Sequence, residues 1–250
     1  MPSLYIHHRI KKAISTPDYI RILILRTIGN FLIYSSLFMI GKTFYQPVMG
    51  EVRYYFDKVV NRQYVVAETS PEKAVQQQKV IEEENVPRNG LSSLLNIKPV
   101  EIIKPVDPEF GIIIPKINAN ATIVPNVNSA NEDQYLAALK QGVAHAEGTA
   151  FPGEGGHIFL FAHSTDYFWN VGTYNAIFYL LYKVQKEDEI DMFYKNQRYV
   201  YKVIDTQIVD PTQVEFLTRK SNKEFLTLQT CWPPGTTLKR LLVFAVRVIE

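Results

Sequence analysis

The chain's single cysteine, Cys231, is the first candidate for chemistry. It ends the strand-like run TLQTC, and the rigid turn WPPG follows at once. Because side chains alternate along a strand, Cys231 shares a face with Thr227 and Gln229, the less apolar side of the run. A thiol at a strand end beside a loop is well placed to act as a nucleophile. The alternative role for a free cysteine is that of a small buried apolar residue.

Arg240 is the second candidate, and it lies nine positions after Cys231. It is in phase with five apolar residues of the next strand-like run, at positions 238, 242, 244, 246 and 248. If the loop 232–237 joins the two runs as a hairpin, Arg240 and Cys231 meet at one end of the sheet. A guanidinium there would lower the pKa of the thiol or donate hydrogen bonds to an oxyanion. Pairing of Arg240 with an acidic neighbour is the alternative.

A thiol nucleophile needs a base or a cationic partner, and the sequence offers five histidines. His7 and His8 lie in the N-terminal tail, His145 follows a helical segment, and His157 begins a strand. His163 ends the run HIFLFAHST at a strand-to-loop boundary, which makes it the favoured partner. For any single one of these histidines, a core or surface position remains the default. A metal enzyme is disfavoured, because no ligand spacing surrounds the candidate histidine.

The composition excludes several classes of protein. With 46 % hydrophobic and 21 % charged residues among 250, the chain is neither a disordered tail nor a coiled coil. Aromatic residues make up 12 %, which favours β-rich structure over a helix bundle. One cysteine excludes an internal disulfide and a cysteine-based zinc cluster. The formal net charge of +2 gives no reason to expect a nucleic-acid partner.

Short strand-like runs dominate the chain from Phe110 onward. Turn residues separate seven of them: Ile112–Ile117, Thr122–Val127, His157–Ala162, Ile190–Tyr194, Tyr199–Val209, Glu224–Cys231 and Leu238–Ile249. With one or two short helices between them, these runs predict a mainly β fold, a mixed barrel.

One helix is well marked between the second and third runs. Asn131 is its N-cap, Gln134 follows three residues later, and Gly142 ends it. Val143 falls on the apolar face of this helical pattern. The apolar stretch Tyr174–Tyr182 predicts a second, helical connector.

An uncharged apolar stretch, TIGNFLIYSSLFMIG, lies near the N-terminus at 27–41. Extended over 22–46, it is long enough to cross a bilayer, and we expect a retained signal anchor. A buried core helix or a cleaved signal peptide is the alternative, but the following residues offer no small-residue cleavage site. Residues 1–26 carry five basic residues and one acidic residue, so the N-terminus is expected in the cytoplasm and the remainder outside the cell.

These patterns divide the chain into four parts. A basic cytoplasmic tail at 1–21 precedes the transmembrane anchor at 22–46. An extracytoplasmic stalk follows at 47–108, with the proline-rich, polar composition of a linker and a helix expected around 70–85. The β domain occupies 109–250.

Residues from about 110 to 250 resemble the sortases, membrane-anchored cysteine transpeptidases of bacterial surfaces. Three motifs carry the likeness: GVAHAEGTAFPGE at 142–154, FAHS at 161–164, and TLQTC at 227–231 followed by Arg240. The last is the most specific, because its order, strand context and paired arginine all agree. The subclass is left open, with single-anchor class D/E-like members the most similar.

The resemblance implies an eight-stranded sortase-like β-barrel with one or two short helices. It implies that Cys231 attacks the carbonyl between Thr and Gly of an LPxTG-like sorting signal and forms a thioester. His163 would be the general acid and then the base, and Arg240 would bind substrate or the oxyanion. Thr230 and Trp232, on either side of the nucleophile, are further candidates for substrate binding.

Some positions depart from the family pattern. His157 stands where family members commonly have Asn. The Asp-Pro pair at 107–108 is similar to the aspartate-proline-aromatic lid of pilus-building members, but Glu109 separates it from the aromatic Phe110. The acidic residues Glu187, Asp188, Glu189 and Asp191 are similar to those of calcium-stimulated members, although a charged turn is the simpler interpretation. No cofactor is expected.

The expected partners are proteins bearing an LPxTG-like C-terminal signal, an amine acceptor on a wall precursor or protein subunit, and the membrane, with no nucleic acid. Two other functions stay open. One is a membrane-tethered cysteine endopeptidase that hydrolyses the thioester. The other is a non-catalytic barrel that binds a partner.

Overall fold

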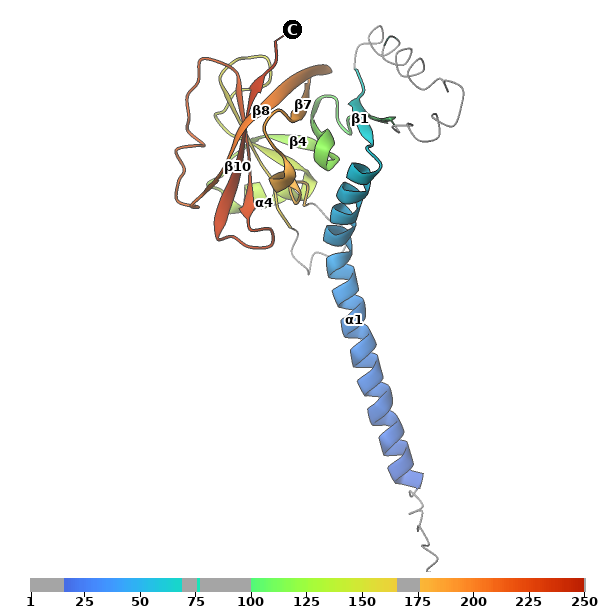
Figure 1. The fold of residues 1–250 in the computed structure, drawn as a ribbon. Helices are drawn as coiled ribbons and strands as arrows, with labels where there is room; N and C mark the ends of the chain where they lie inside the picture. Colours follow the sequence, from blue (N-terminus) through green and yellow to red (C-terminus); the bar gives the residue numbers. More distant parts are fainter. Residues whose placement is uncertain (1–15, 69–75, 77–99, 166–175, 250) are drawn as a thin grey trace, which may run out of the picture. The chain divides into compact units, whose positions relative to one another are not determined.

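The computed structural model describes residues 16–68, 76, 100–165 and 176–249. Contacts divide the chain into two units, Met1–Gln46 and Pro47–Glu250, which are considered separately. The helix α1 (Thr16–Val59) begins in the first unit and ends in the second. Most strands of the second unit wrap into a barrel (Figure 1).

The described part of the first unit is the beginning of α1. Its residues Pro17–Lys42 form a stretch of 26 residues with a mean hydropathy of 1.6 in its most apolar window, none of which is buried. The hydroxyls of Thr27 and Ser36 donate to the carbonyls of Leu23 and Ile33, both at 2.9 Å, so the helix itself satisfies them. The chain therefore carries one N-terminal helix with the length and composition of a single-pass membrane anchor.

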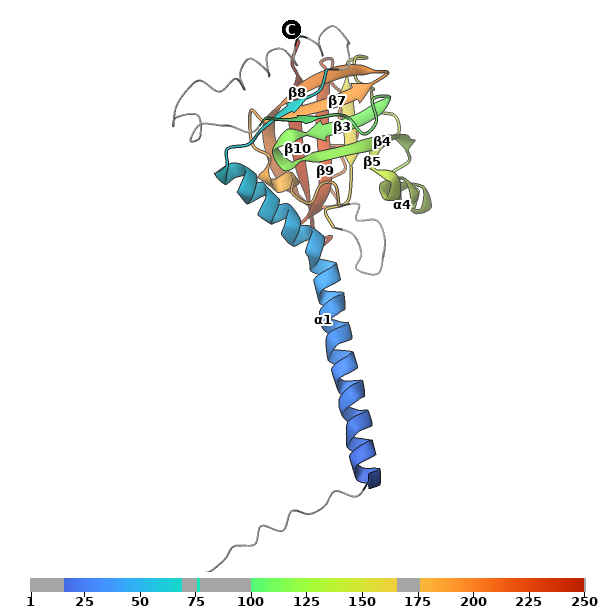
Figure 2. The ribbon, with the colours of Figure 1, turned by 90° about the vertical axis from the view of Figure 1, so that its right-hand side faces the viewer.

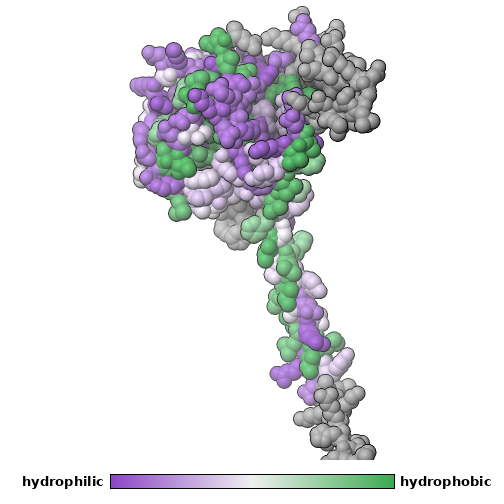
Figure 3. Space-filling view, viewed as in Figure 1, coloured by the Kyte–Doolittle hydropathy of each residue, from purple (hydrophilic) through white to green (hydrophobic). Residues whose placement is uncertain are grey.

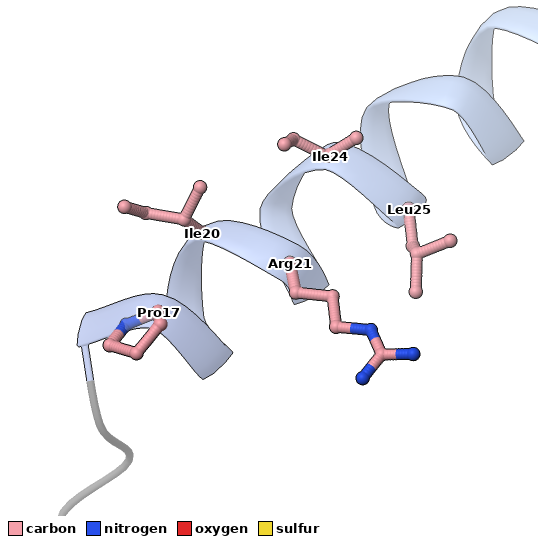
Figure 4. Close-up of a pocket in the computed structure, with 5 residues that line it drawn as sticks. All are labelled: Pro17, Ile20, Arg21, Ile24 and Leu25. Atoms are coloured by element: carbon pink, nitrogen blue, oxygen red, sulfur yellow. The ribbon is translucent and has the colours of Figure 1, made fainter.

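Apolar side chains cover much of the visible surface of α1 (Figure 3). The helix begins before the predicted anchor at 22–46 and continues past it without a break to Val59. A shallow, mainly apolar groove lies on the exposed surface near its beginning (Figure 4), lined by Pro17, Ile20, Arg21, Ile24 and Leu25. This groove is a feature of the anchor helix surface.

Eight strands close the barrel in the order β10-β8-β7-β3-β4-β5-β6-β9. They are β3 (Phe110–Ile114), β4 (Ala119–Val127), β5 (Val143–Ala146), β6 (His157–Phe161), β7 (Glu189–Tyr194), β8 (Gln197–Val209), β9 (Phe225–Trp232) and β10 (Lys239–Arg247). Neighbours pair antiparallel except β4 with β5 and β6 with β9, which are parallel. The predicted mainly β fold and the eight-stranded barrel are confirmed.

Every second side chain of the strands points into the barrel and fills its core. Ile158 and Leu160 of β6, Leu226 and Leu228 of β9, and Val243 of β10 meet there and are fully buried. Burying each such side chain stabilises the fold by about 1.5–3 kcal/mol relative to leaving it exposed. Because this core occupies the inner face of each strand, only the outer face can carry side chains that contact a substrate.

The predicted helix is present as α4 (Glu132–Gln141). The Asn131 side chain accepts from the Gln134 amide at 3.1 Å, which satisfies one of the free N–H groups at the helix start. A Cβ at Gly142 would lie 2.2 Å from the Thr122 carbonyl oxygen, so only glycine fits where the chain leaves the helix against β4.

Some predicted boundaries were wrong. Val143 begins β5, whose parallel pairing with β4 overrides the helical pattern. The run Ile112–Ile117 ends as a strand at Ile114, and a 3-10 turn, η1 (Pro115–Ile117), follows because proline cannot donate to the ladder. In the described part of Tyr174–Tyr182, turns lead into a second 3-10 element, η2 (Leu181–Lys183), in place of an α-helix.

Part of the predicted stalk belongs to the folded unit. β1 (Gln63–Val66) and β2 (Val100–Ile103) form a parallel pair. Their buried residues Val66 and Ile103 pack on Ile113 and Phe193 of the barrel. The helix expected around 70–85 falls, except for position 76, outside the described residues.

Candidate active site

Strand β9 pairs with β6 on one side and with β10 on the other, and these pairings set how far along the barrel each candidate residue lies. Figure 2 shows β9 and β10 in the barrel. β9 and β10 run antiparallel, with Cys231 directly opposite Arg240. The pairing therefore brings together, across one hairpin, the thiol and the guanidinium that the sequence predicts at the same sheet end.

His163 lies on the other side of β9, at about the same level along the strand as Cys231. The parallel pairing of β6 with β9 sets Phe161 beside Gln229. The ladder continues beyond β6, because the Ala162 amide donates to the Gln229 carbonyl at 3.1 Å. If this register is extended by two residues along each segment, His163 falls beside Cys231. Since adjacent strands lie about 4.8 Å apart, His163, Cys231 and Arg240 form one row across three neighbouring segments.

The three side chains also share a face. Core residues occupy the even positions of β6 and β9 and the odd positions of β10. Alternation then places His163, Cys231 and Arg240 on the outer face of the barrel. Each of the three is partly exposed, so a substrate can reach them. Cys231 and Arg240 lie in β9 and β10, and His163 follows the end of β6. Cys231 is only partly buried, so it does not take the alternative role of a fully buried core residue.

Thr230, a candidate for substrate binding, points the opposite way. Its side chain is buried, and its hydroxyl donates to the Ala162 carbonyl at 2.9 Å. That bond ties β9 to the backbone immediately before His163. The geometry therefore gives Thr230 the role of holding the two segments together and leaves no support for its contact with substrate.

Arg240 extends from the start of β10 toward the preceding loop. Its Nη1 donates to the carbonyls of Thr237 and Lys239, both at 3.1 Å. Among the described residues, no carboxylate forms an ion pair with it. Backbone carbonyls of the adjoining loop thus hold the guanidinium of a residue whose Cα is paired with Cys231, and among the described residues no acidic side chain neutralises its charge.

The turn that follows Cys231 is held by several short contacts. Both the amide and the hydroxyl of Thr236 donate to the Pro233 carbonyl, at 3.0 and 2.8 Å. Gly235 adopts a φ of +84°, a conformation that favours glycine, and its missing Cβ would lie 3.9 Å from Thr165. The loop from Cys231 to Arg240 therefore lies beside the segment that follows His163.

Trp232, the second candidate for substrate binding, packs against the barrel end. It is partly buried on the core cluster, and its ring centroid lies 5.4 Å from that of Tyr182. The sequence pattern places Tyr182 only in an apolar connector and does not single it out. No local motif marks it, since its contact with Trp232 joins residues 50 positions apart.

The two described histidines other than His163 are structural. His145 is fully buried: its Nδ1 accepts from the Asn126 amide at 3.3 Å, and Nε2 lies 3.0 Å from the Ala150 carbonyl oxygen. Burial lowers the pKa of His145, which keeps the ring neutral. His157 contacts the Thr227 hydroxyl at 2.9 Å through Nε2, and burial lowers its pKa to about 4. His7 and His8 lie outside the described residues.

Three of the four acidic residues compared with a calcium site, Asp188, Glu189 and Asp191, pair with basic side chains. Asp188 pairs with Lys116 at 2.8 Å. Glu189 and Asp191 both pair with Arg198, at 3.1 and 2.8 Å. Burial raises the pKa of Asp191 to about 7, against the lowering effect of the Arg198 charge. In the described part of the chain, no group of three or more metal-ligating side chains comes together.

The Asp-Pro pair compared with a lid caps the start of a strand. The Asp107 Oδ1 accepts from the amides of Glu109 and Phe110, at 2.9 and 3.3 Å, and so turns the chain into β3. Three strands separate β3 from β9 in either direction around the barrel. The pair therefore lies on the far side of the barrel from the strand that carries Cys231, and the structure gives no support for a lid there.

Comparison with known proteins shows which family the chain with this row of residues belongs to. A family model described as the sortase domain matches residues 112–248, more than half of the chain. The chain belongs to the sortase family. The matched region contains His163, Cys231 and Arg240, so the resemblance seen in the three motifs is confirmed at the level of the family.

Individual sortases are similar over the same region. Sortase D of Bacillus subtilis (strain 168) is 30 % identical over 142 residues, which cover 55 % of this chain and 63 % of that protein. The chain thus matches less than two thirds of the length of this relative. The crystal structure of sortase C-1 from Actinomyces oris is 30 % identical, covers 58 % of this chain and 77 % of its own, and superposes with a TM-score of 0.48. A Clostridium perfringens sortase D5 transpeptidase is 23 % identical, with coverage of 67 % and 89 % and a TM-score of 0.46.

Proposed function

We propose that this sortase is a cysteine transpeptidase that cleaves an LPxTG-like sorting signal between Thr and Gly and transfers the acyl group to an amine. The observation that carries the proposal is the row of His163, Cys231 and Arg240 on one outer face of neighbouring strands. A nucleophile, an acid–base group and a cation at one strand end are what acyl transfer requires.

The first half-reaction uses all three side chains. The Cys231 thiolate attacks the Thr carbonyl carbon, and the carbonyl π electrons move onto oxygen. Arg240 donates hydrogen bonds to that oxyanion or to the neighbouring substrate carbonyl. When the C–N bond breaks, protonated His163 gives its proton to the leaving Gly nitrogen, and a thioester remains on Cys231.

The second half-reaction reverses these roles. Neutral His163 takes a proton from the incoming amine, whose nitrogen attacks the thioester carbonyl. The C–S bond then breaks, a new amide forms, and Cys231 leaves as thiolate. If water takes the place of the amine, the same steps give hydrolysis, which is the endopeptidase alternative.

The setting proposed for this reaction is the outer side of the cell membrane. The anchor helix, with basic residues at its N-terminal side, supports a cytoplasmic N-terminus and an extracytoplasmic barrel. The substrates are then proteins with an LPxTG-like C-terminal signal, and the acceptor is an amine on a wall precursor or a protein subunit. The class D/E-like assignment of the single-anchor chain agrees with the similarity to sortase D.

The test is an assay of the full-length protein with a fluorescent LPxTG-containing peptide, with and without an added amine such as triglycine or a diaminopimelate-type peptide. An amine-dependent ligated product and a hydroxylamine-trapped acyl-enzyme on Cys231 are expected, and Cys231→Ala should abolish both. Only hydrolysed peptide under all acceptors would favour the endopeptidase. Unchanged turnover in Cys231→Ala would exclude both enzymatic roles.

A further inference from the structure

The end of α1 is joined to the barrel by a compact polar and aromatic contact. Within the second unit, the helix segment Pro47–Val59 lies against the residues around η2. The Tyr182 hydroxyl donates to the Glu51 carboxylate, and the Lys183 ammonium lies 3.3 Å from the same carboxylate. A Cβ at Gly50 would lie 3.8 Å from Leu180, which shows how closely the helix backbone approaches.

Lys183 completes this contact through aromatic rings. Its Nζ lies 5.1, 4.8 and 4.8 Å from the ring centroids of Tyr54, Tyr55 and Tyr182, and it donates to the Tyr55 hydroxyl at 3.2 Å. Burial and the Glu51 carboxylate raise the pKa of Tyr182 to about 12, so its hydroxyl keeps its proton as a donor. Glu51, Tyr182 and Lys183 are therefore held together by complementary charge and hydrogen bonding.

The same segment reaches the active site on its other side. The Tyr182 ring packs on Trp232, with centroids 5.4 Å apart and the planes inclined by 53°. The Phe178 amide donates to the His163 carbonyl at 3.3 Å. One short segment, 178–183, thus contacts three places: α1, Trp232 after Cys231, and the backbone of His163. Figures 1 and 2 show α1 and the barrel.

We propose that the end of α1 is part of the catalytic unit, with Glu51 and Tyr182 as positioning residues that hold Trp232 and segment 178–183, and through them the alignment of Cys231 with His163. This inference rests on the proposed function and adds a role for the helix that follows the anchor. Misplacing a reacting group by about 1 Å costs on the order of 100-fold in rate. Loosening the contact therefore acts on the chemical step more than on substrate binding, because neither residue lies in the row of reacting groups.

The test uses four variants of the full-length chain in detergent micelles. Glu51→Ala removes the acceptor, whereas Glu51→Gln keeps an oxygen for Tyr182. Tyr182→Phe removes the hydroxyl but keeps the ring on Trp232. The matched control is Glu101→Gln, because Glu101 pairs with Arg62 at 3.0 Å and links the α1 end to β2, away from the catalytic strands.

Glu51→Ala is expected to lower kcat about 10- to 100-fold, with KM within about threefold. Glu51→Gln and Tyr182→Phe should lose less, and Glu101→Gln should keep the wild-type kcat. Circular dichroism and the thermal midpoint show that each variant is folded. A wild-type kcat in both Glu51→Ala and Tyr182→Phe would overturn the inference, as would an equal loss in Glu101→Gln.

A second readout separates this inference from the proposed function. The rate of Cys231 alkylation by iodoacetamide, measured against pH, reports the environment of the thiol without a sorting peptide. If the wild type ligates no sorting peptide but Glu51→Ala still changes this alkylation profile relative to Glu101→Gln, the proposed function fails and the positioning role stands. If ligation is intact and both the profile and kcat are unchanged in Glu51→Ala, the positioning role alone fails.

Discussion

Cys231 and Arg240 are direct partners across the antiparallel pair β9–β10, and both project from the outer face of the barrel. Backbone pairing, and not side-chain contact alone, fixes this relationship. A short and tightly bonded turn closes the hairpin between them, so neither residue can shift along its strand without breaking the register.

Arg240→Gln is therefore expected to lower kcat/KM for a sorting peptide by about 100- to 1,000-fold, the usual effect of losing one oxyanion donor. Arg240→Lys should recover only part of this, because an ammonium lacks the planar fork of a guanidinium. The control is Lys239→Gln, which removes the neighbouring cation and its exposed pair with Asp210 at 2.7 Å. Equal losses in the Gln variants at 239 and 240 would show that only general positive charge matters.

The proposed pairing of His163 with Cys231 predicts a bell-shaped dependence of kcat/KM on pH. One limb reports formation of the thiolate and the other the loss of the histidine proton, as two macroscopic values of the free enzyme. His163→Ala should abolish the bell and lower turnover, while leaving the far-UV circular dichroism unchanged. A profile that is flat between pH 5 and 10 in the wild type would contradict the acid–base role of His163.

Thr230 gives a test of how β6 is held against β9. Thr230→Val keeps the shape of the side chain but leaves the buried Ala162 carbonyl without its 2.9 Å hydrogen bond. The free energy of unfolding should fall by about 1–3 kcal/mol. Thr230→Ser, which keeps the hydroxyl, should recover most of this stability. Urea denaturation of both variants measures the difference, and an equal stability of the Val variant and the wild type would show that the bond contributes nothing.

Much of the barrel, and much of the row formed by His163, Cys231 and Arg240, can be predicted from local patterns. Strand alternation identifies the faces of Cys231 and Arg240, and the length of the loop between them indicates a hairpin that brings them together. The parallel pairing of β6 with β9 has no such local signal, because β7 and β8 lie between the partners Phe161 and Gln229 in the sequence. The sequence therefore favours His163 by its place at a strand end, and only the pairing explains why it stands at the height of Cys231.

Other features depend on contacts that a sequence pattern does not carry. The four residues of β5 follow a helix directly, and only the available edge of β4 makes Val143 the start of a strand. Similarly, the polar residues after the anchor suggest a stalk, yet Val66 and Ile103 are buried on the barrel. Tyr182 gains its importance only from its neighbours, Glu51 and Trp232, which come from distant parts of the chain.

His157 links stability to pH. Burial lowers its pKa from 6.5 to about 4 in the folded protein. Between these pH values the unfolded chain binds more protons than the folded one, so stability falls as the pH drops from 6.5 toward 4. The full shift corresponds to about 3 kcal/mol. Asp191 acts in the opposite direction over part of this range, because its raised pKa of about 7 favours the folded state at low pH.

His157→Asn isolates this contribution from that of Asp191. The amide cannot take up a proton here, so the difference in unfolding free energy between variant and wild type should change by about 2–3 kcal/mol in favour of the variant as the pH falls from about 8 to about 4. Its value at the upper pH serves as the internal control, since it reports only the altered contact with Thr227 at 2.9 Å. Urea denaturation at about six pH values measures the difference. A constant difference across that range would mean that His157 titrates alike in the folded and unfolded states, and that its burial does not exclude the charged ring.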